Sequence, residues 1–320
     1  MKIALLGTGF GRAHAAVYAT RPDIDEVIVF GRTPAKLQAV AGEYGFATTT
    51  DLDAIYADPD VTLVDICLPT ELHAEHAVRA MQAGKDVLCE LPLAASMADA
   101  HRIIDAQRAS GRQLFVDMFA RFSPVNEYTR KAITDGTYGP LRTWEIDTRT
   151  ALLWPGYDLL LNSLAVDALH TDLDTITTAL GRPASVTAHG IQGEQRGSAA
   201  HILLNYPGDV LVRCSASAFM PASYGMGGGS RLVFAEGVLE TEFTAGADGQ
   251  GRTHLVEYTD TGRRTIDLPV RAPYAAVIDH VLACLAGKET SRITPDSILD
   301  GLQLTLDVRE QLAARNQPNI

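Results

Sequence analysis

A glycine-rich segment near the N-terminus is the part of this sequence with the clearest chemical meaning. An apolar run, Ile3–Leu6, precedes Gly7, Gly9 and Gly11, and residues that favour a helix follow. This order predicts a buried strand, a tight turn and a helix start, whose N–H groups and dipole favour an anion. We therefore predict a dinucleotide site here; the alternative is a strand-to-helix turn that holds nothing. The third glycine stands one position earlier than Gly-x-Gly-x-x-Gly would place it. At the pyrophosphate we expect Gly7, Thr8, Gly9, Phe10, Gly11 and Arg12.

The end of the next predicted strand, Asp25–Phe30, bears on which dinucleotide is bound. An Asp or Glu at this tip would bind the ribose 2′-hydroxyl of NAD, but Arg32 and Thr33 stand there instead. Arg32 can pair with a 2′-phosphate and stack on the adenine, and the Thr33 hydroxyl can donate to the same phosphate. A surface arginine, with Thr33 capping a helix that Pro34 opens, is the alternative, and both can hold together. This chemistry favours NADP over NAD.

Composition limits the classes of partner. The 320 residues are 46% hydrophobic, enough for two domains with separate cores. The net charge is −12 without a basic block, which argues against nucleic acid or an anionic membrane surface. No apolar run has spanning length and the start lacks a signal-peptide pattern, so we expect a cytoplasmic protein. The four cysteines show no metal or redox spacing; we expect buried free thiols at Cys67 and Cys89, and no metal site.

Strands and helices alternate over the first part of the chain. The predicted strands are Lys2–Leu6, Glu26–Phe30, Leu63–Cys67, Asp86–Cys89 and Gln113–Asp117. Between them lie the predicted helices Phe10–Thr20, Pro34–Tyr44, Leu72–Ala83 and Ser96–Ala109. Apolar strands that alternate with helices predict an α/β fold, a doubly wound parallel sheet with ligands at the carboxyl ends of its strands.

The pattern changes near residue 120. A helix, Ser123–Asp135, a strand, Leu141–Arg149, and a helix, Ala165–Leu180, are followed by a series of β-like runs. These runs are residues 185–194, 199–206, 209–219, 231–243, 253–259 and 263–269, with a helical region, Tyr274–Ala314, after them. We therefore predict a dinucleotide-binding domain at 1–120 and an α+β domain with a large, mainly antiparallel sheet at 121–320. The glycines of Gly225–Gly229 predict a flexible loop.

Three segments resemble the glucose–fructose oxidoreductase/inositol dehydrogenase (Gfo/Idh/MocA) family. They are GTGFGRAHA, LPTELHAEHAVRAMQAGKDVLCELPLA and ARFSPVNEYTRKAITDGTYGPL. The resemblance implies a Rossmann domain, an α/β domain whose sheet often serves oligomerisation, and oxidation or reduction of sugars and cyclitols with NAD or NADP. We accordingly expect a small-molecule substrate and a homo-oligomer, dimer or tetramer, formed through the C-terminal sheet.

The resemblance also assigns residues near the nicotinamide. It places Leu68, Pro69, Thr70, His73, Glu90 and Leu91 at that end of the cofactor. For His73, a purely local role at the start of a helix is the alternative. The family's Glu-Lys-Pro motif becomes Glu90-Leu91-Pro92, so the lysine that usually serves as acid and base is absent.

The family's second motif, Asp-x-Gly-x-His-x-x-Asp, corresponds to the stretch Asn162–Asp174. In the favoured register Asp167 and Asp174 take the acidic positions, and Thr171 replaces the catalytic histidine. Aligning His170 instead requires a shift of one residue. Because consecutive helix residues point about 100° apart, only one of His170 and Thr171 is expected to face the pocket. A structural histidine is the alternative for His170.

The missing acid leaves three explanations open, because loss of a placed acid costs about 10²–10⁴ in rate. Another group substitutes: His170, Asp167 through a water, Thr171 or Tyr157. Alternatively the substrate is a protonated imine and needs no acid, or the chain binds NADP(H) without turnover. Arg121 and Trp154 are further candidates for substrate binding. An interdomain salt bridge is the alternative for Arg121, and packing at the domain junction is the alternative for Trp154 and Tyr157.

These observations favour an NADP-dependent oxidoreductase that transfers a hydride between nicotinamide and a sugar, cyclitol or related polyhydroxylated carbonyl compound. An NADPH-dependent imine reductase of a biosynthetic pathway and a non-catalytic NADP(H)-binding protein are the alternatives.

Overall fold

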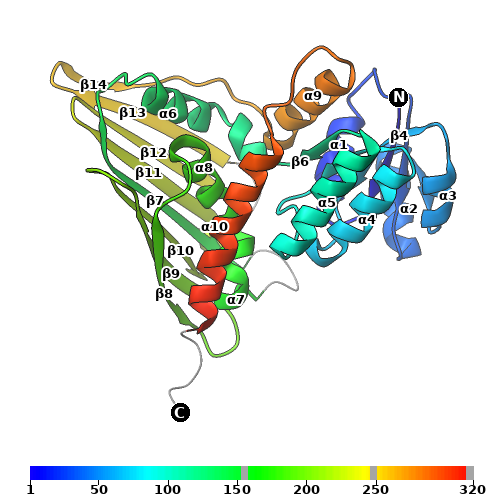
Figure 1. The fold of residues 1–320 in the computed structure, drawn as a ribbon, viewed down its shortest axis with the longest axis horizontal. Helices are drawn as coiled ribbons and strands as arrows, with labels where there is room; N and C mark the ends of the chain where they lie inside the picture. Colours follow the sequence, from blue (N-terminus) through cyan, green and yellow to red (C-terminus); the bar gives the residue numbers. More distant parts are fainter. Residues whose placement is uncertain (153–157, 246–250, 315–320) are drawn as a thin grey trace. The chain divides into compact units, whose positions relative to one another are not determined.

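The computed structural model describes residues 1–152, 158–245 and 251–314, and its chain forms two compact units (Figure 1). The first unit combines Met1–Phe122 with Arg271–Leu299, and the second combines Ser123–Val270 with the chain from Asp300 onward. These units differ from the ranges 1–120 and 121–320 because residues 271–299 return to the first unit.

The first unit holds a six-stranded sheet in the order β3-β2-β1-β4-β5-β6, with parallel pairing throughout. Its strands are β1 (Lys2–Leu6), β2 (Glu26–Phe30), β3 (Ala47–Thr49), β4 (Val61–Ile66), β5 (Asp86–Cys89) and β6 (Leu114–Val116). The continuous apolar runs are buried, with Ile3, Leu5 and Leu6 completely inaccessible, as expected for a sheet covered on both faces. The prediction of a doubly wound parallel sheet is confirmed.

The helices of the first unit follow the predicted alternation. They are α1 (Gly11–Tyr18), α2 (Pro34–Tyr44), α3 (Leu52–Ala57), α4 (Thr70–Gln82), α5 (Met97–Ser110) and α9 (Pro273–Leu285), with a 3₁₀ turn at Phe119–Phe122. The short elements β3 and α3 escaped prediction. The Asp51 side chain starts α3 by accepting hydrogen bonds from the backbone N–H groups of Asp53 and Ala54.

The second unit is built on an eight-stranded sheet in the order β14-β13-β12-β11-β7-β10-β9-β8. Its strands are β7 (Leu141–Ala151), β8 (Ser185–Gln192), β9 (Ser198–Asn205), β10 (Leu211–Met220), β11 (Met226–Phe234), β12 (Val238–Ala245), β13 (Gly251–Thr259) and β14 (Gly262–Thr265). Among the described strands β7 and β10 pair in parallel and the other neighbours are antiparallel, which confirms the mainly antiparallel prediction.

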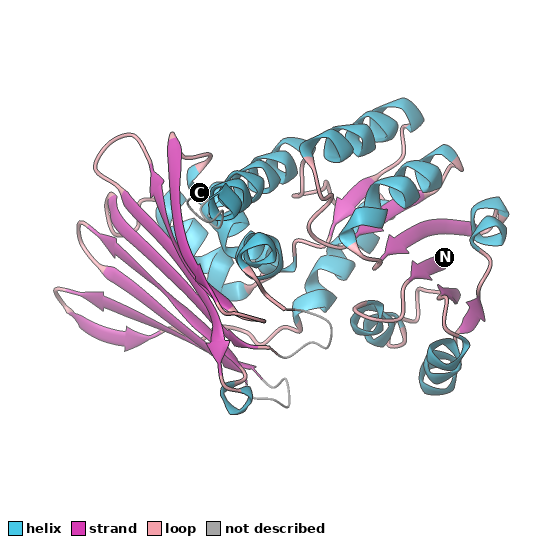
Figure 2. Ribbon diagram, turned by 90° about the horizontal axis from the view of Figure 1, so that it is seen from below, coloured by secondary structure: helices cyan, strands magenta, loops and turns pink. Residues whose placement is uncertain are grey.

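Helices cover one face of this sheet (Figure 2). They are α6 (Pro124–Thr134), α7 (Leu161–Leu164), α8 (His170–Leu180) and the part of α10 (Pro295–Ala314) that belongs to the second unit; a single π-helical turn, Ala165–Leu169, joins α7 to α8. Trp144, Leu173, Ile202 and Val308 belong to the core between these helices and the sheet. No helix among the described residues combines the length and apolar character needed to cross a membrane.

Two predictions in this unit were wrong. The run 231–243 contains two strands, β11 and β12, and not one. The glycines of Gly225–Gly229 do not form a flexible loop, because Met226–Gly229 begin β11. A Cβ on Gly228 would lie 2.3 Å from the Asp147 carbonyl oxygen, and one on Gly229 would lie 2.7 Å from that of Thr241. The glycines therefore permit a close approach of neighbouring strands.

Candidate active site

The turn between β1 and α1 has the geometry that the glycines predict. Gly7 has φ +122°, and a Cβ there would lie 2.3 Å from the carbonyl oxygen of Cys67. A Cβ on Gly11 would meet the Cys67 Cβ at 3.3 Å and the Leu5 Cδ1 at 3.4 Å, so this glycine lets α1 pack closely on β1. Gly9 faces open space, with nothing within 4 Å of its Cβ position. The unusual spacing thus has a packing reason, because Gly11 supplies the close helix–strand contact.

The other residues of this turn lie at the surface. Phe10 and Arg12 are exposed and Thr8 is half-buried. Arg12 forms an ion pair with Glu43 of α2. At the end of β2, Arg32 and Thr33 are both exposed. Thr33 occupies the N-cap position of α2 with Pro34 after it, but the Thr33 side chain makes no capping hydrogen bond.

His73 holds together the loops that follow β4 and β5. Its ring is 1% exposed, with Nε2 2.8 Å from the Leu68 carbonyl oxygen and Nδ1 3.0 Å from that of Pro92. The Leu91–Pro92 peptide bond is cis. Exposed Pro69 and half-buried Leu91 lie in these loops, and half-buried Thr70 begins α4. His73 is therefore placed to position this edge of the sheet.

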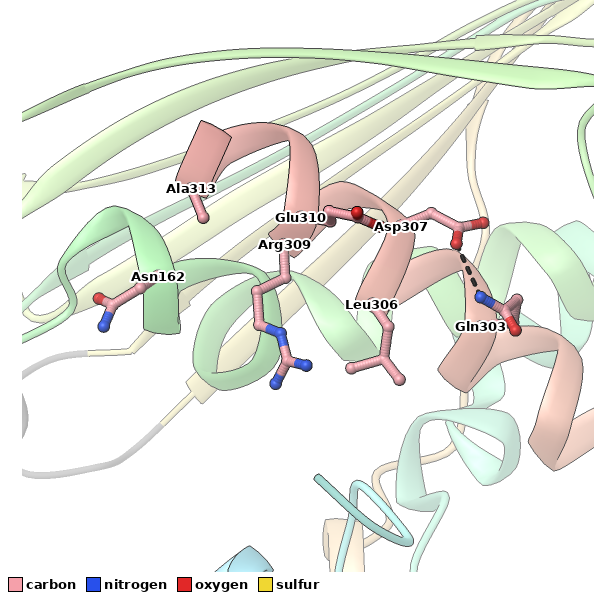
Figure 3. Close-up of a pocket in the computed structure, with 7 residues that line it drawn as sticks. All are labelled: Asn162, Gln303, Leu306, Asp307, Arg309, Glu310 and Ala313. Atoms are coloured by element: carbon pink, nitrogen blue, oxygen red, sulfur yellow. Dashed lines mark hydrogen bonds between the residues drawn. The ribbon is translucent and has the colours of Figure 1, made fainter. Parts of the chain in front are cut away.

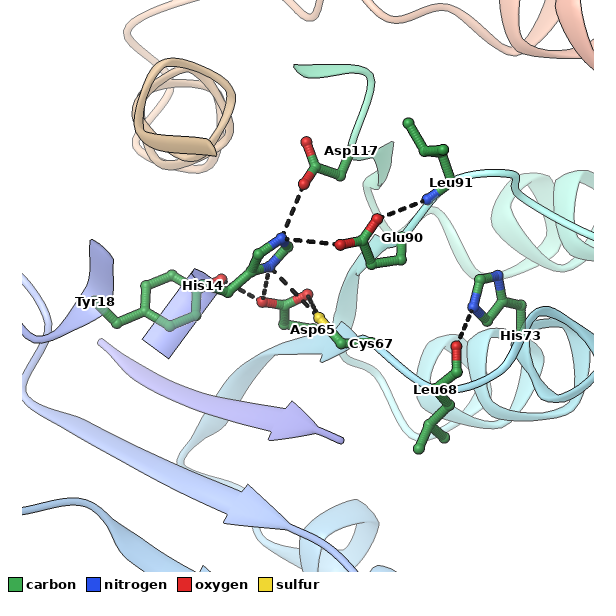
Figure 4. A network of polar contacts seen from close by, with 9 residues as sticks. All are labelled: His14, Tyr18, Asp65, Cys67, Leu68, His73, Glu90, Leu91 and Asp117. Carbon is green, nitrogen blue, oxygen red and sulfur yellow. Dashed lines mark hydrogen bonds and ion pairs between the residues drawn. The ribbon is translucent and has the colours of Figure 1, made fainter. Parts of the chain in front are cut away.

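A group of buried polar residues lies where β4, β5 and β6 end, and sequence analysis missed most of it (Figure 4). We call it the His14 cluster; its members are His14, Tyr18, Asp65, Cys67, Glu90 and Asp117. His14 Nδ1 lies 2.7 Å from Asp65 Oδ2, and Nε2 lies 2.8 Å from Asp117 Oδ2. The Glu90 Oε1 is 3.4 Å from the same Nε2, and Glu90 Oε2 accepts the Leu91 N–H at 3.1 Å. The imidazole thus faces three carboxyl groups.

The Asp65 carboxylate receives further donors. The Tyr18 hydroxyl donates to Oδ2 at 2.6 Å, and the Cys67 thiol approaches Oδ1 at 3.5 Å. Burial raises the pKa of Tyr18 and of Cys67 well above their ordinary values, so both remain protonated donors. Cys67 and Cys89 are buried free thiols, as the sequence predicts.

Protons bind tightly in this cluster. Burial alone lowers the pKa of His14, but the carboxylates, Asp65 first, outweigh burial and raise that pKa well above its usual value. Burial raises the pKa of Asp117 to about 7, against the hydrogen bond from His14. Asp117 is completely buried, and its Oδ1 has no hydrogen-bond partner among the described residues. The geometry therefore fits an imidazolium beside a buried Asp117 that retains its proton near neutral pH.

Ligand atoms of His14, Cys67 and Glu90 lie within 4.8 Å of one another, a spacing that could hold a metal ion. Both ring nitrogens of His14 are instead within 2.8 Å of carboxylate oxygens. The protonated His14 ring supplies a positive charge to the carboxyl groups, and both of its nitrogens are already hydrogen-bonded.

The sequence did contain a signal for this cluster. Asp65 interrupts an apolar strand, and Asp117 ends another. A charged residue in a buried strand must be paired, and His14, on the inner face of α1, is the partner. The apolar residues of these strands predict their burial, and their acidic residues require a buried partner.

In the second unit, His170 and Asp174 point toward α10. His170 is 1% exposed, and its Nδ1 lies 2.8 Å from Thr305 Oγ1. Because the Thr305 hydroxyl donates to the Gly301 carbonyl oxygen, it accepts from the His170 N–H. A Cβ on Gly301 would lie 2.6 Å from Asp174 Oδ1, so this glycine makes room for the buried carboxylate. Thr171 is half-buried and Asp167, in the π-helical turn, is exposed.

The remaining predicted site residues do not form one group among the described residues. Arg121 donates to the hydroxyl and the carbonyl oxygen of Ser297, at 2.8 and 3.1 Å, within the first unit. Trp154 and Tyr157 lie outside the described residues. Asp172, which sequence analysis did not single out, accepts a hydrogen bond from Thr148 at 2.7 Å, and burial raises its pKa to about 6.

A cavity of about 500 Å³ lies in the second unit beside α10 (Figure 3). Its lining residues are Asn162, Gln303, Leu306, Asp307, Arg309, Glu310 and Ala313. Asn162 begins the stretch matched to the second family motif, but Asp167, His170 and Thr171, the described members of the predicted catalytic set, do not line this cavity. The cavity is therefore distinct from the His14 cluster and from the glycine turn.

The first unit, with its glycine turn after the first strand, is a Rossmann-type nucleotide-binding domain. Residues 1–118 match the family described as "Oxidoreductase family, NAD-binding Rossmann fold", Gfo/Idh/MocA. The chain is 31% identical over 206 residues to D-glucoside 3-dehydrogenase of Escherichia coli (strain K12), covering 60% of this chain and 58% of that protein. It is 33% identical over 192 residues to inositol 2-dehydrogenase of Rhizobium meliloti (strain 1021), covering 59% and 58%. Residues 1–118 therefore belong to the Gfo/Idh/MocA oxidoreductase family.

The matched part spans less than two thirds of these curated relatives. Over nearly its whole length the fold resembles UDP-N-acetylglucosamine 3-dehydrogenase from Acidithiobacillus ferrooxidans. That comparison has a TM-score of 0.82 at 23% identity and covers 98% of each chain. The architecture of both units is thus shared with a solved structure, while the chemistry of this chain rests on its own residues.

Proposed function

We propose that this chain is a nicotinamide-dependent oxidoreductase acting on a sugar, cyclitol or related polyhydroxylated carbonyl compound. The observation that carries the proposal is the glycine turn of a family whose named relatives here are sugar and cyclitol dehydrogenases. A dinucleotide fits the residues present, because Gly9 leaves open space at the start of α1 and Gly7 admits no side chain. The bound cofactor would supply or accept the hydride.

We propose NADP as the preferred cofactor. Arg32 and Thr33 stand exposed at the end of β2, and no carboxylate stands there to repel a 2′-phosphate. A charge-assisted hydrogen bond contributes about 1.5–3 kcal/mol. Arg32→Ala is therefore expected to weaken NADPH binding about 10- to 150-fold and to change NADH binding little. Arg102→Ala, on the exposed surface of α5, is the matched control; equal losses for both cofactors would remove the proposed role of Arg32.

Among the catalytic candidates we propose Asp167 and Thr171 as substrate contacts. Asp167 is exposed and Thr171 half-buried, whereas buried His170 donates to Thr305 and so positions α8 on α10. Arg121, Trp154 and Tyr157 remain proposed substrate-side residues.

The replacement at Leu91 favours one second candidate, an imine reductase. A protonated imine already carries its proton, so hydride delivery would suffice and no lysine would be required. This reading predicts that Leu91→Lys does not improve turnover. A large gain in carbonyl reduction by this variant would instead indicate a sugar dehydrogenase that has lost its usual acid.

We also propose that the chain forms a homo-oligomer through the open face of the large sheet. By strand alternation this face carries Ile191, Leu203, Leu211 and Phe219, each at least 39% exposed. Apolar side chains gathered on one face favour a partner surface. Sedimentation of the wild type and of a Leu203→Lys/Leu211→Lys variant tests this proposal; an unchanged sedimentation coefficient would contradict it.

The first experiment is fluorescence titration with NADPH and NADH, followed by turnover with paired panels. One panel holds polyols and keto-sugars, including myo-inositol, and the other holds cyclic imines. Carbonyl turnover supports the primary proposal and imine turnover supports the second. Tight NADPH binding without any turnover would identify a non-catalytic cofactor-binding protein.

A further inference from the structure

We propose that Glu90 exchanges the reaction's proton with the substrate, and that Asp117 and His14 resupply it. This inference rests on the proposed hydride transfer and identifies the group that takes over from the missing lysine. Its structural basis is the His14 cluster at the carboxyl ends of β4, β5 and β6, the edge of a doubly wound sheet where ligands bind.

Glu90 is the member of the His14 cluster whose side chain is most accessible to a substrate. Its side chain is 12% exposed, whereas the side chains of His14, Asp65 and Asp117 are completely buried. The Leu91 N–H holds Oε2 of Glu90, and Oε1, which is buried and makes no hydrogen bond among the described residues, lies 3.4 Å from His14 Nε2. Leu91 itself adds no charge. Glu90 is therefore the route by which a proton can leave the buried cluster.

The charges of the groups around His14 explain why the cluster holds a proton that it can donate. The groups that face His14 are Asp65 and Cys67 at the end of β4, Glu90 after β5, Asp117 after β6, Tyr18 on α1 and Tyr274 on α9. Tyr18, Cys67 and Tyr274 are neutral, because burial raises the pKa of each. One imidazolium thus faces three carboxyl groups. Asp65 accepts from three donors, and burial raises the pKa of Asp117 to about 7, so the retained proton lies on Asp117.

The transfer balances in both directions. In reduction, the carbonyl carbon receives the hydride, the C=O electron pair moves to oxygen, and that oxygen takes the proton from Glu90. Glu90 receives this proton from His14 Nε2, which lies 3.4 Å from Glu90 Oε1, while the ring takes up the one proton that Asp117 holds, so Asp117 ends the step as a carboxylate. The emptied carboxylate recovers a proton from solvent through Glu90 between turnovers. Oxidation of an alcohol runs the same sequence backward, with Glu90 as the base.

The test compares Glu90→Gln and Asp117→Asn with the wild type and with Glu75→Gln, an exposed control on α4. We expect Glu90→Gln to lower kcat about 10²–10⁴-fold while NADPH affinity changes less than about threefold. Asp117→Asn is expected to remove the inflection near pH 7 from the kcat profile. In the cofactor-free protein, ¹³C carboxyl NMR should show one aspartate titrating near pH 7 that is absent from Asp117→Asn.

Contrary results separate the two proposals. If Glu90→Gln turns over within about threefold of the wild type, or no carboxyl titrates between pH 5 and 9, the role of Glu90 is overturned and the oxidoreductase proposal stands. If Glu90→Gln loses NADPH binding and keeps its kcat, Glu90 is a structural residue and the inference fails. If the wild type binds NADPH but reduces or oxidises nothing in either panel, both proposals are overturned.

Discussion

Replacing Asp117 with asparagine should change how the stability of the first unit depends on pH. The folded protein holds a proton on Asp117 to about pH 7, whereas an unfolded chain releases it near 3.8. A raised folded pKa stabilises the fold at low pH, and this stabilisation is lost as the pH rises from about 4 to 7. The shift corresponds to at most about 4 kcal/mol, or a slope of up to about 1.4 kcal/mol per pH unit.

Asparagine does not titrate, so this loss is absent from Asp117→Asn. Between pH 5 and 7 the free energy of unfolding of the variant, relative to that of the wild type, should therefore rise by about 2–3 kcal/mol. The raised pKa of His14 also makes the free energy of unfolding fall as the pH rises, but only above about pH 6.5. The variant and the wild type are therefore compared below pH 7. Urea unfolding followed by far-UV circular dichroism measures the difference. Hydrogen exchange of the β4 and β6 amides assigns it to the first unit. Asp105→Asn, at an exposed site on α5, should show no such slope. If the free energies of unfolding of Asp117→Asn and the wild type change with pH in parallel, Asp117 does not hold a proton in the folded protein near neutral pH.

Two further substitutions test the architecture. Gly7→Ala places a Cβ 2.3 Å from the Cys67 carbonyl oxygen at φ +122°, so we expect a loss of about 1–3 kcal/mol in stability and at least about tenfold in NADPH affinity. Gly42→Ala, inside α2 with nothing within 4 Å, should instead stabilise by up to about 1 kcal/mol; a neutral Gly7→Ala would contradict the tight turn. Thr305→Val leaves the His170 N–H without its acceptor and should destabilise the second unit by about 1–3 kcal/mol, whereas Thr305→Ser should not. Intrinsic tryptophan fluorescence during urea unfolding reports the change, because Trp144 lies in the core of this unit.

The fold was predictable where one physical rule governs a segment. Continuous apolar runs between helical stretches predicted the parallel sheet, and the bounds of β1 and β5 agree with the structure to the residue. The return of residues 271–299 to the first unit was not visible, because helix-forming residues do not indicate which sheet they cover. The glycines of β11 were misread, since glycine favours loops unless a neighbouring strand approaches closely, and that approach depends on distant residues.

The candidate site also has one part that the sequence predicts and one part that it does not. The glycine turn follows from local sequence, because a positive φ and a helix N-terminus are local properties. The His14 cluster unites residues as far apart as His14 and Asp117, and only the strand order brings them together. For His170 the sequence leaves a catalytic and a structural role open. The structure adds a hydrogen bond to Thr305 on α10, which only the fold brings within reach.

The leucine at position 91 and the proton held by Asp117 can be understood as one electrostatic feature. A lysine beside Glu90, as in the family's Glu-Lys-Pro motif, would add a second cation to three carboxyl groups that share one imidazolium. Two cations would favour ionised carboxylates, since a nearby positive charge lowers a carboxyl pKa. With leucine there, the excess of buried negative charge is relieved by retaining a proton, which agrees with the direction of the Asp117 shift. The leucine that stands in place of the expected lysine therefore agrees with the proposed role of a neighbouring carboxyl group as the donor.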